Sequence, residues 1–315
     1  MSIEENDIDY CKVLSSRSEN DGANKKREDI IIQIIEWISL ILFGDISQGP
    51  LFLFENHDWK NLYGEIEEYL FTNIPGGYEK ENIIFLKPKK FGGRRGNYDF
   101  SVIYGVNGLP DHVRNIEFKF NVERVEDCPQ FHSPFDPESY IISEIPFTKF
   151  HYENYLCIYE SFMEMNKPSY EEYKGQMKFS NIPTNQFLRE CQKKYYAGSS
   201  GSSQYTGLQE DITFYELSKE ISEESFERYF DICELNHERL TNIWLEKQKN
   251  KEYMLLKDGS LNYQKIDENA YKIVSVEKKC PNFICRTENG KILEVRFRWK
   301  NGHGIAFPAF QVKMI

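Results

Sequence analysis

Asp99, Glu117 and Lys119 are the residues whose types and spacing offer the clearest chemistry in this sequence. Glu117 and Lys119 stand two positions apart in a segment that alternates polar and apolar residues. On a β-strand both side chains therefore point to one face and Phe118 points to the other. Carboxylates bind Mg²⁺, a hard ion that prefers oxygen ligands, and a nearby ammonium stabilises negative charge in a transition state. The set suits metal-assisted phosphodiester hydrolysis, with Mg²⁺ as the expected cofactor and Mn²⁺ as a substitute.

The elements that must position these residues are two strands and the turn between them. β-branched and aromatic residues with period-two alternation predict strands at 97–105 and 113–122, and turn-forming residues fill the link 106–111. The three segments together predict a β-hairpin. Pairing along this hairpin brings Asp99 beside the Glu-x-Lys triplet, so two carboxylates and a lysine converge at one sheet edge.

Asp99 followed by Glu117-Phe118-Lys119 on the next strand resembles the motif of the PD-(D/E)xK nuclease superfamily, which includes many type II restriction endonucleases. The resemblance implies that the two acidic residues bind the metal and that the main-chain carbonyl of Phe118 assists them. It also implies that Lys119 is catalytic, and that the core consists of a helix, three strands, a second helix and a fourth strand.

The sequence departs from the family motif at the residue before the aspartate, which is Tyr98 and not proline. A literal Pro-Asp occurs at Pro110-Asp111, only a few residues before the Glu-x-Lys triplet. That position is too close to the triplet to precede a separate full strand, so we favour Asp99. A shifted hairpin register would favour Asp111.

Members of the superfamily often add a glutamate from the first helix as a further metal or water ligand. Glu65 is the predicted residue, because it borders the apolar stripe of the helix 57–72 and can face the sheet. Glu67 and Glu68 are alternatives on the same helix. Glu36 is the alternative if the preceding helix takes that role.

The predicted fold is α/β: a restriction-endonuclease-like core, with a mixed central sheet flanked by helices, a helical insertion and a C-terminal β-rich module. The core is assigned to helix 57–72, strands 82–86, 97–105 and 113–122, helix 222–250 and strand 252–256, after a buried helix at 27–43. The domains are a flexible tail at 1–26, a nuclease domain at 27–264 with its insertion at about 123–221, and a module at 265–315 for nucleic-acid recognition.

Basic residues concentrate in two places that flank aromatic, strand-like segments. The first group comprises Lys89, Lys90, Arg94 and Arg95. Glycines within it permit close backbone approach to a phosphate, which arginines bind in a bidentate way. The second group comprises Arg296, Arg298 and Lys300. These side chains share one face of a predicted strand and suit contacts with phosphates or base edges. The alternatives are a loop that merely ends a strand and an exposed charged face over an aromatic core.

The 315-residue chain is 40% hydrophobic and 15% aromatic, which allows a sizeable buried core. Its seven cysteines are scattered without a C-x-x-C pair, which argues against a disulfide framework and a structural zinc site. No apolar run approaches the roughly 20 residues of a membrane span, and residues 1–26 contain no apolar signal segment. We therefore expect an intracellular protein without a membrane partner, cytoplasmic or, in a eukaryote, nuclear.

The net charge of −11 does not itself point to a nucleic-acid ligand, but the distribution of charge matters more than its sum. The resemblance and the basic groups predict a Mg²⁺-dependent endonuclease that hydrolyses phosphodiester bonds in DNA. Sequence-specific, restriction-type cleavage is the narrower expectation. The alternatives are an RNA endonuclease with the same core and a catalytically inactive, nuclease-like nucleic-acid-binding protein. Cleavage of both strands of a palindrome would favour a homodimer.

Overall fold

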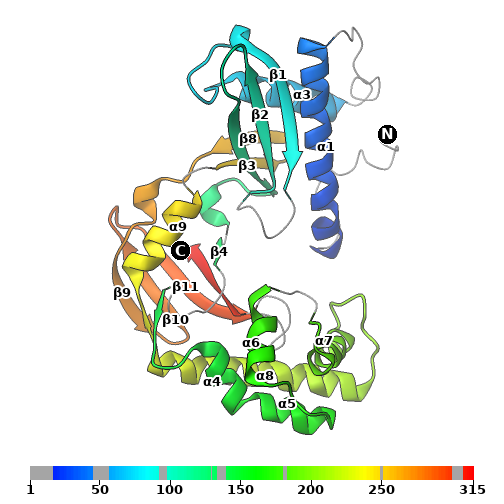
Figure 1. Ribbon diagram of the computed structural model, residues 1–315, viewed down its shortest axis with the longest axis vertical. Helices are drawn as coiled ribbons and strands as arrows, with labels where there is room; N and C mark the ends of the chain where they lie inside the picture. The colour runs from blue at the N-terminus through cyan, green and yellow to red at the C-terminus, as the bar shows by residue number, and fades with distance from the viewer. Residues whose placement is uncertain are drawn as a thin grey trace. The chain divides into compact units, whose positions relative to one another are not determined.

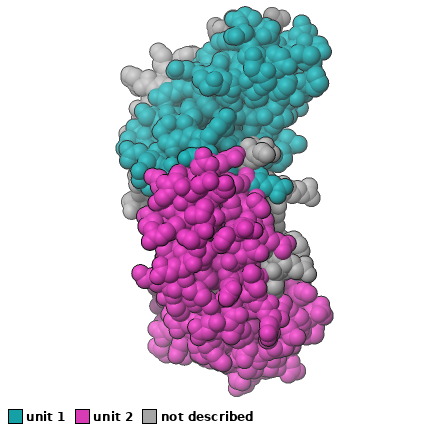
Figure 2. All heavy atoms as spheres, turned by 90° about the vertical axis from the view of Figure 1, so that its left-hand side faces the viewer, with its two compact units in different colours: residues 1–128, 246–267 teal, residues 129–245, 268–315 magenta. Residues whose placement is uncertain are grey.

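The computed structural model describes residues 17–44, 57–91, 98–128, 130–132, 140–179, 183–248, 251–299 and 308–315. The chain divides into two compact units, which Figure 2 colours separately. Unit 1 comprises residues 1–128 and 246–267, and unit 2 comprises residues 129–245 and 268–315. The helical middle region therefore belongs to the same unit as the C-terminal strands.

Unit 1 is built on a mixed five-stranded sheet in the order β1-β2-β3-β7-β8. Its strands are β1 (Ile83–Lys90), β2 (Phe100–Val106), β3 (His112–Phe120), β7 (Glu252–Lys257) and β8 (Ser260–Gln264). β3 and β7 run parallel, and the other neighbouring pairs are antiparallel. The predicted hairpin is confirmed, because β2 pairs with β3 and places Phe100 opposite Ile116. In its turn Gly108 has φ of 72°, a conformation that glycine adopts without a steric penalty.

Two helices, α1 (Arg17–Phe43) and α3 (His57–Phe71), cover one face of this sheet. Figure 1 shows α1 lying along β1. Both helices bury an apolar stripe at helical spacing, as the sequence predicts. The stripe residues are Ile30, Ile31, Ile34, Ile35 and Ile38 of α1 and Leu62, Ile66, Tyr69 and Leu70 of α3. Since α1 begins at Arg17, residues 17–26 belong to this helix and not to a tail; residues 1–16 lie outside the described ranges.

The sheet of unit 1 is buried on both faces along β7, which explains the continuous apolar sequence of that strand. Met254 and Leu256 face the two helices, whereas Tyr253 and Leu255 pack with Val125 on the opposite side. The opposite side is the face to which alternation directs Glu117 and Lys119, since Glu117 pairs with Tyr253 in the parallel ladder. The core thus fixes which side of the sheet carries the charged residues.

Unit 2 combines helices with an antiparallel sheet in the order β4-β12-β11-β10-β9. Its helices are α4 (Phe147–Asn154), α5 (Leu156–Met163), α6 (Tyr170–Phe179), α7 (Gln186–Gly198), α8 (Gln209–Ile232) and α9 (His237–Gln248), the last of which crosses into unit 1. Its strands are β4 (Gln130–His132), β5 (Ile141–Ile142), β6 (Glu234–Leu235), β9 (Ile273–Lys279), β10 (Asn282–Thr287), β11 (Ile292–Trp299) and β12 (Pro308–Met314). The helical middle region and the C-terminal β-rich segment are therefore both present. Single-turn 3₁₀ helices lie at Lys80–Asn82, Val125–Asp127 and Glu268–Ala270.

The single helix predicted at 222–250 is wrong, because the chain breaks into α8 and α9 with the short strand β6 between them. Cys233 takes an extended conformation, and β6 pairs with β5. Asn236 then caps α9, accepting a hydrogen bond from the N–H of Arg239 on its Oδ1 at 3.0 Å. Asparagine is among the preferred residues at a helix N-cap, so this boundary had a sequence signal.

No helix in the described part of the chain is long and apolar enough to cross a membrane. The six cysteines within the described ranges form no disulfide, in agreement with their scattered spacing. Cys280 and Cys285, which are close together in the sequence, are among these six. Cys11 lies outside those ranges.

His151 lies at the centre of an aromatic cluster in unit 2. Its side chain is fully buried, and its ring stacks on Tyr155 at a centroid distance of 5.6 Å. Its Nδ1 shares a hydrogen bond with the Tyr173 hydroxyl at 3.1 Å. Burial lowers the pKa of His151 to about 3, so the ring stays neutral in the folded protein.

We expect unit 2 to lose stability below about pH 6.5 because unfolding lets His151 take up a proton. The loss begins at the unfolded pKa and continues toward the folded pKa near 3, at roughly 1.4 kcal/mol per pH unit, or about 2 kcal/mol at pH 5. Denaturant titrations at pH 7.5 and pH 5 should show it in the wild type and not in His151→Phe. An equal pH dependence in both proteins would contradict the prediction.

Candidate active site

Asp99 is docked against β3 through both its main chain and its side chain. Its N–H donates to the carbonyl of Ile116 at 3.0 Å, and its own carbonyl accepts from the N–H of Phe91 at 2.9 Å. Its Oδ2 accepts a hydrogen bond from the N–H of Phe118 at 2.8 Å. The carboxylate thus replaces a main-chain acceptor at the end of the β2–β3 ladder. This contact fixes the Asp99 side chain beside the Glu-x-Lys triplet.

Glu117 and Lys119 share one face of β3. Lys119 Nζ lies 2.5 Å from Glu117 Oε1, and the neighbouring Ile116 and Phe118 are buried in the core on the other side. The triplet therefore presents an ion pair to one face and an apolar anchor to the other, as alternation predicts.

The hairpin register determines which aspartate meets the triplet. Asp111 immediately precedes β3 at its first residue, so it lies about 20 Å along the strand from Glu117. Asp99 immediately precedes β2, whose first residue pairs with Ile116. The structure therefore brings Asp99 to the triplet and leaves Asp111 at the turn end of the hairpin.

Lys251 is a further charged residue at this site, and the sequence motif does not include it. It stands directly before β7, and its Nζ contacts Glu117 Oε2. The parallel pairing of β3 with β7 makes the contact, joining residues 134 positions apart. Only 5% of the Lys251 side chain is exposed. A lysine directly before an apolar strand was the one local signal available for it.

Burial and neighbouring charges set the ionisation of these groups. Burial raises the pKa of Asp99, with a contribution from the negative charge of Glu117, and outweighs together with it the lowering effects of Lys119, the Phe118 N–H and Lys251. Burial also acts to raise the pKa of Glu117, but Lys119 and Lys251 outweigh it and lower that pKa. Burial acts to lower the pKa of Lys119, but the two carboxylates raise it overall. Glu117 and Lys119 are thus an ion pair at neutral pH, and a bound cation would stabilise ionised Asp99.

Glu28 of α1 is the helix glutamate that the structure brings to this site. Burial, followed by the charge of Asp99, raises the pKa of Glu28 to about 7, and Lys90 and Lys119 oppose the rise. The charges of Asp99 and Lys119 therefore act on Glu28. The sequence favours Glu65, with Glu67, Glu68 and Glu36 as alternatives, and gives no signal for Glu28, which follows the predicted helix start at Arg27.

The two neighbours of Glu28 fix this turn of α1 to the sheet. The Arg27 guanidinium lies 3.4 Å above the centre of the Phe120 ring and is buried. Asp29 pairs with Lys90 at the end of β1. Cation–π and ionic contacts on either side of one residue restrict where its own side chain can point. The turn of α1 that contains Glu28 is therefore anchored at the ends of β1 and β3.

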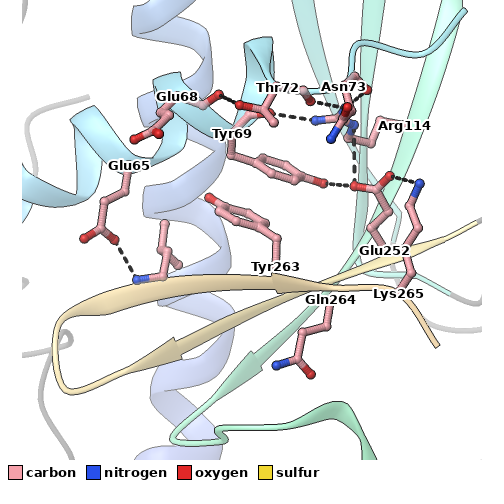
Figure 3. Close-up of a pocket in the computed structure, with 11 residues that line it drawn as sticks. Glu65, Glu68, Tyr69, Thr72, Asn73, Arg114, Glu252, Tyr263, Gln264 and Lys265 are labelled. Carbon is pink, nitrogen blue, oxygen red and sulfur yellow. Dashed lines mark hydrogen bonds and ion pairs between the residues drawn. The ribbon is translucent and has the colours of Figure 1, made fainter. Parts of the chain in front are cut away.

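Glu65, the helix glutamate predicted from sequence, lies elsewhere in unit 1. It lines an open pocket of about 600 Å³ between α3 and β8, where its Oε2 accepts a hydrogen bond from the N–H of Leu261 at 2.6 Å (Figure 3). Glu68 lines the same pocket, and Glu67 pairs with Lys80. The contacts of these three residues lie in this pocket and at Lys80, so α3 does not bring them to Asp99.

The same pocket contains a network of charged and aromatic residues that anchors the start of β7 (Figure 3). Glu252 accepts a hydrogen bond from the Tyr69 hydroxyl at 2.5 Å and pairs with Arg114 at 3.6 Å and with Lys265 at 3.0 Å. Tyr263 stacks on Tyr69 with ring centroids 3.4 Å apart. Glu252 follows Lys251 in the chain, so the beginning of β7 is held on both faces of the sheet.

The predicted basic groups are only partly described. Lys89 and Lys90 are exposed at the end of β1, and Lys89 lies 5.0 Å from the centre of the Phe91 ring. Arg296 is exposed on β11 in unit 2. The described ranges exclude Arg94, Arg95 and Lys300, as well as the side chain of Arg298. The two groups belong to different units.

The oxygen donors that the resemblance assigns to a metal are Asp99, Glu117 and the carbonyl of Phe118. The N–H of Phe118 faces Asp99, and in a β-ladder the carbonyl of the same residue points to the same side. Within the described ranges, no group of three or more His, Cys, Asp or Glu side chains is arranged to hold a metal ion. Two carboxylates and a carbonyl nevertheless fit Mg²⁺, which commonly keeps several water ligands.

No protein-family profile matches the chain, and no curated protein is detectably similar to it in sequence.

Proposed function

We propose that unit 1 is a PD-(D/E)xK-type nuclease core that hydrolyses phosphodiester bonds with a divalent metal ion. The docking of the Asp99 carboxylate on the N–H of Phe118 carries this proposal, because it holds both acidic residues and Lys119 on one pair of strands. The chain order supports it as well. β1 to β3 and β7 of unit 1, with α3 before them, supply the first helix, the three strands and the final strand of a restriction-endonuclease-like core. α9 precedes β7 in the chain and only its last residues belong to unit 1.

Each residue of the site has a separate role in the proposed reaction. Asp99, Glu117 and the Phe118 carbonyl would hold Mg²⁺, which when bound supplies neutralising charge at the phosphate and lowers the pKa of water. The Lys119 ammonium stabilises the charge that develops on the phosphate oxygens. Glu28, with its pKa near 7, is suited to orient the attacking water and to accept its proton.

DNA is the proposed substrate, with RNA as the alternative. Lys89 and Lys90 are exposed on the strand next to that of Asp99, where they can contact phosphates on either side of the cleaved bond. Contacts of this kind give affinity for any polyanion and no sequence preference. A preference of the restriction type would depend on base contacts such as those proposed for Arg296, Arg298 and Lys300.

Cleavage assays with different substrates test the proposed function. The protein is incubated with supercoiled circular DNA, linear duplex DNA and a structured RNA, each with Mg²⁺, with Mn²⁺ or with EDTA. We expect the circular DNA to be nicked or linearised with metal and to stay intact in EDTA, since an endonuclease requires no free end. No cleavage of either nucleic acid with either metal, together with salt-dependent binding, would instead establish a binding protein.

Glu28→Gln is expected to lower the cleavage rate about ten- to a hundredfold at neutral pH. The amide cannot accept the proton of the attacking water, but it has nearly the same shape and leaves the neighbouring anchors in place. Glu36→Gln on the same helix and Glu65→Gln on α3 are matched controls, because Glu36 is exposed and Glu65 lines the α3–β8 pocket. Single-turnover cleavage rates of the three variants show which glutamate assists the reaction. A larger loss in either control would assign the role to that glutamate.

A further inference from the structure

The Glu117 carboxylate forms ion pairs with two lysine ammonium groups. Lys119 Nζ lies 2.5 Å from Oε1, and Lys251 Nζ contacts Oε2. Side chains of Glu117 and Lys251 are 15% and 5% exposed, so solvent does little to screen the second contact. Both oxygens of a proposed metal ligand are therefore paired with protein cations.

A divalent cation cannot bind Glu117 while both ammonium groups remain in place, because like charges at this distance repel strongly in a poorly screened site. The two lysines are not equivalent. Lys119 is attracted by both Glu117 and Asp99 and stands on the same strand as Glu117. Burial and the charge of Lys119 disfavour the ammonium form of Lys251, which is attracted by Glu117 and less strongly by Asp99. Lys251 is therefore the ammonium that an incoming metal ion displaces.

We propose, on the basis of the nuclease function above, that Lys251 takes the place of the metal on Glu117 in the metal-free protein and turns to a phosphate of the substrate when the metal binds. A buried ammonium that loses its carboxylate requires another anion, and a phosphodiester oxygen is the anion that the substrate brings. Lys251 is thus a positioning residue that links two ligands. Metal binding and polyanion binding strengthen each other through it.

Mn²⁺ titrations followed by electron paramagnetic resonance test this proposal without relying on activity. Without nucleic acid, Lys251→Met should bind Mn²⁺ about ten- to a hundredfold more tightly than the wild type, because no charged hydrogen bond has to be broken. Lys251→Arg should bind Mn²⁺ more weakly than the wild type, because a guanidinium holds a carboxylate in a bidentate way. Lys257→Met is the control, since this half-buried lysine on β7 pairs with Glu123 and not with Glu117.

A second titration measures how strongly nucleic-acid binding and metal binding are coupled. A noncleavable phosphorothioate duplex should tighten Mn²⁺ binding to the wild type several-fold and have a smaller effect on Lys251→Met. Unchanged or weaker Mn²⁺ binding by Lys251→Met would overturn the proposal and leave the nuclease function intact. If Lys251→Met does not fold, tighter or unchanged binding by Lys251→Arg has the same meaning. Mn²⁺ binding that is absent in the wild type, or unaffected by Asp99→Asn, would instead refute the proposed metal site itself.

Discussion

Asp99→Asn should lower the rate of metal-dependent cleavage by about 10³-fold or more, the size of loss seen when a central catalytic group is removed. The substitution removes a negatively charged oxygen from the proposed metal site. The amide oxygen can still accept the hydrogen bond from the N–H of Phe118, so the end of the hairpin keeps its main anchor. The loss therefore reports on chemistry and not on folding.

Asp111→Asn is the matched control for this substitution. Asp111 is exposed and belongs to the literal Pro-Asp of the sequence, but it lies at the turn end of the hairpin. Its substitution should leave the cleavage rate unchanged. Single-turnover assays at saturating Mg²⁺, with Mn²⁺ binding measured in parallel, compare the two variants. A rate for Asp99→Asn within tenfold of the wild type, or a large loss in Asp111→Asn, would refute the site assignment.

Arg114→Met should destabilise unit 1 by about 3–5 kcal/mol, the cost of removing one member of a buried charged network. The Arg114 side chain is only 2% exposed. Its guanidinium donates to the carbonyls of Tyr69 at 2.9 Å, Thr72 at 2.9 Å and Asn73 at 2.5 Å, and it faces Glu252. Methionine fills similar space but removes the Arg114 donor from the carbonyls of Tyr69 at the end of α3 and of Thr72 and Asn73 after it, and it leaves Glu252 with one cation fewer.

Urea denaturation measures this effect as a lower midpoint at an unchanged slope. Arg124→Met is the matched control, because Arg124 pairs with Asp127 on the surface, with 67% of its side chain exposed. Exposed ion pairs contribute little, so this variant should unfold at the wild-type midpoint. Equal midpoints for Arg114→Met and Arg124→Met would show that the network around Glu252 does not stabilise the unit.

The local part of the site could be predicted from sequence. Strand alternation placed Glu117 and Lys119 on one face, and turn residues between two strand-like segments predicted the hairpin that brings up Asp99. Both signals act over a few residues, where the geometry of a strand or a turn leaves few choices. The choice between Asp99 and Asp111 depended on register, which follows from which residues enter the core.

The remaining residues could not be predicted, because their neighbours are distant in sequence. Lys251 meets Glu117 through a parallel pairing that follows an intervening unit, and no pattern near either residue encodes that partner. The charge of Asp99 acts on Glu28 because Arg27 and Asp29 dock α1 on the sheet, which a helical stripe alone does not specify. The break between α8 and α9 had a signal in Asn236, but the apolar periodicity of the surrounding segment concealed it.

The pairing of β3 with β7 also has a consequence for how the protein is made. A ribosome that has synthesised β3 must add all of residues 129–245 before β7 emerges, so β3 has no partner on that side in the nascent chain. An unpaired strand edge is a site for association with other chains. Lys251 and the anchor at Glu252 arrive with β7, so the charged site is completed only after the intervening unit has been synthesised. Premature termination within that unit would therefore leave an unpaired, aggregation-prone edge on β3 and an incomplete site.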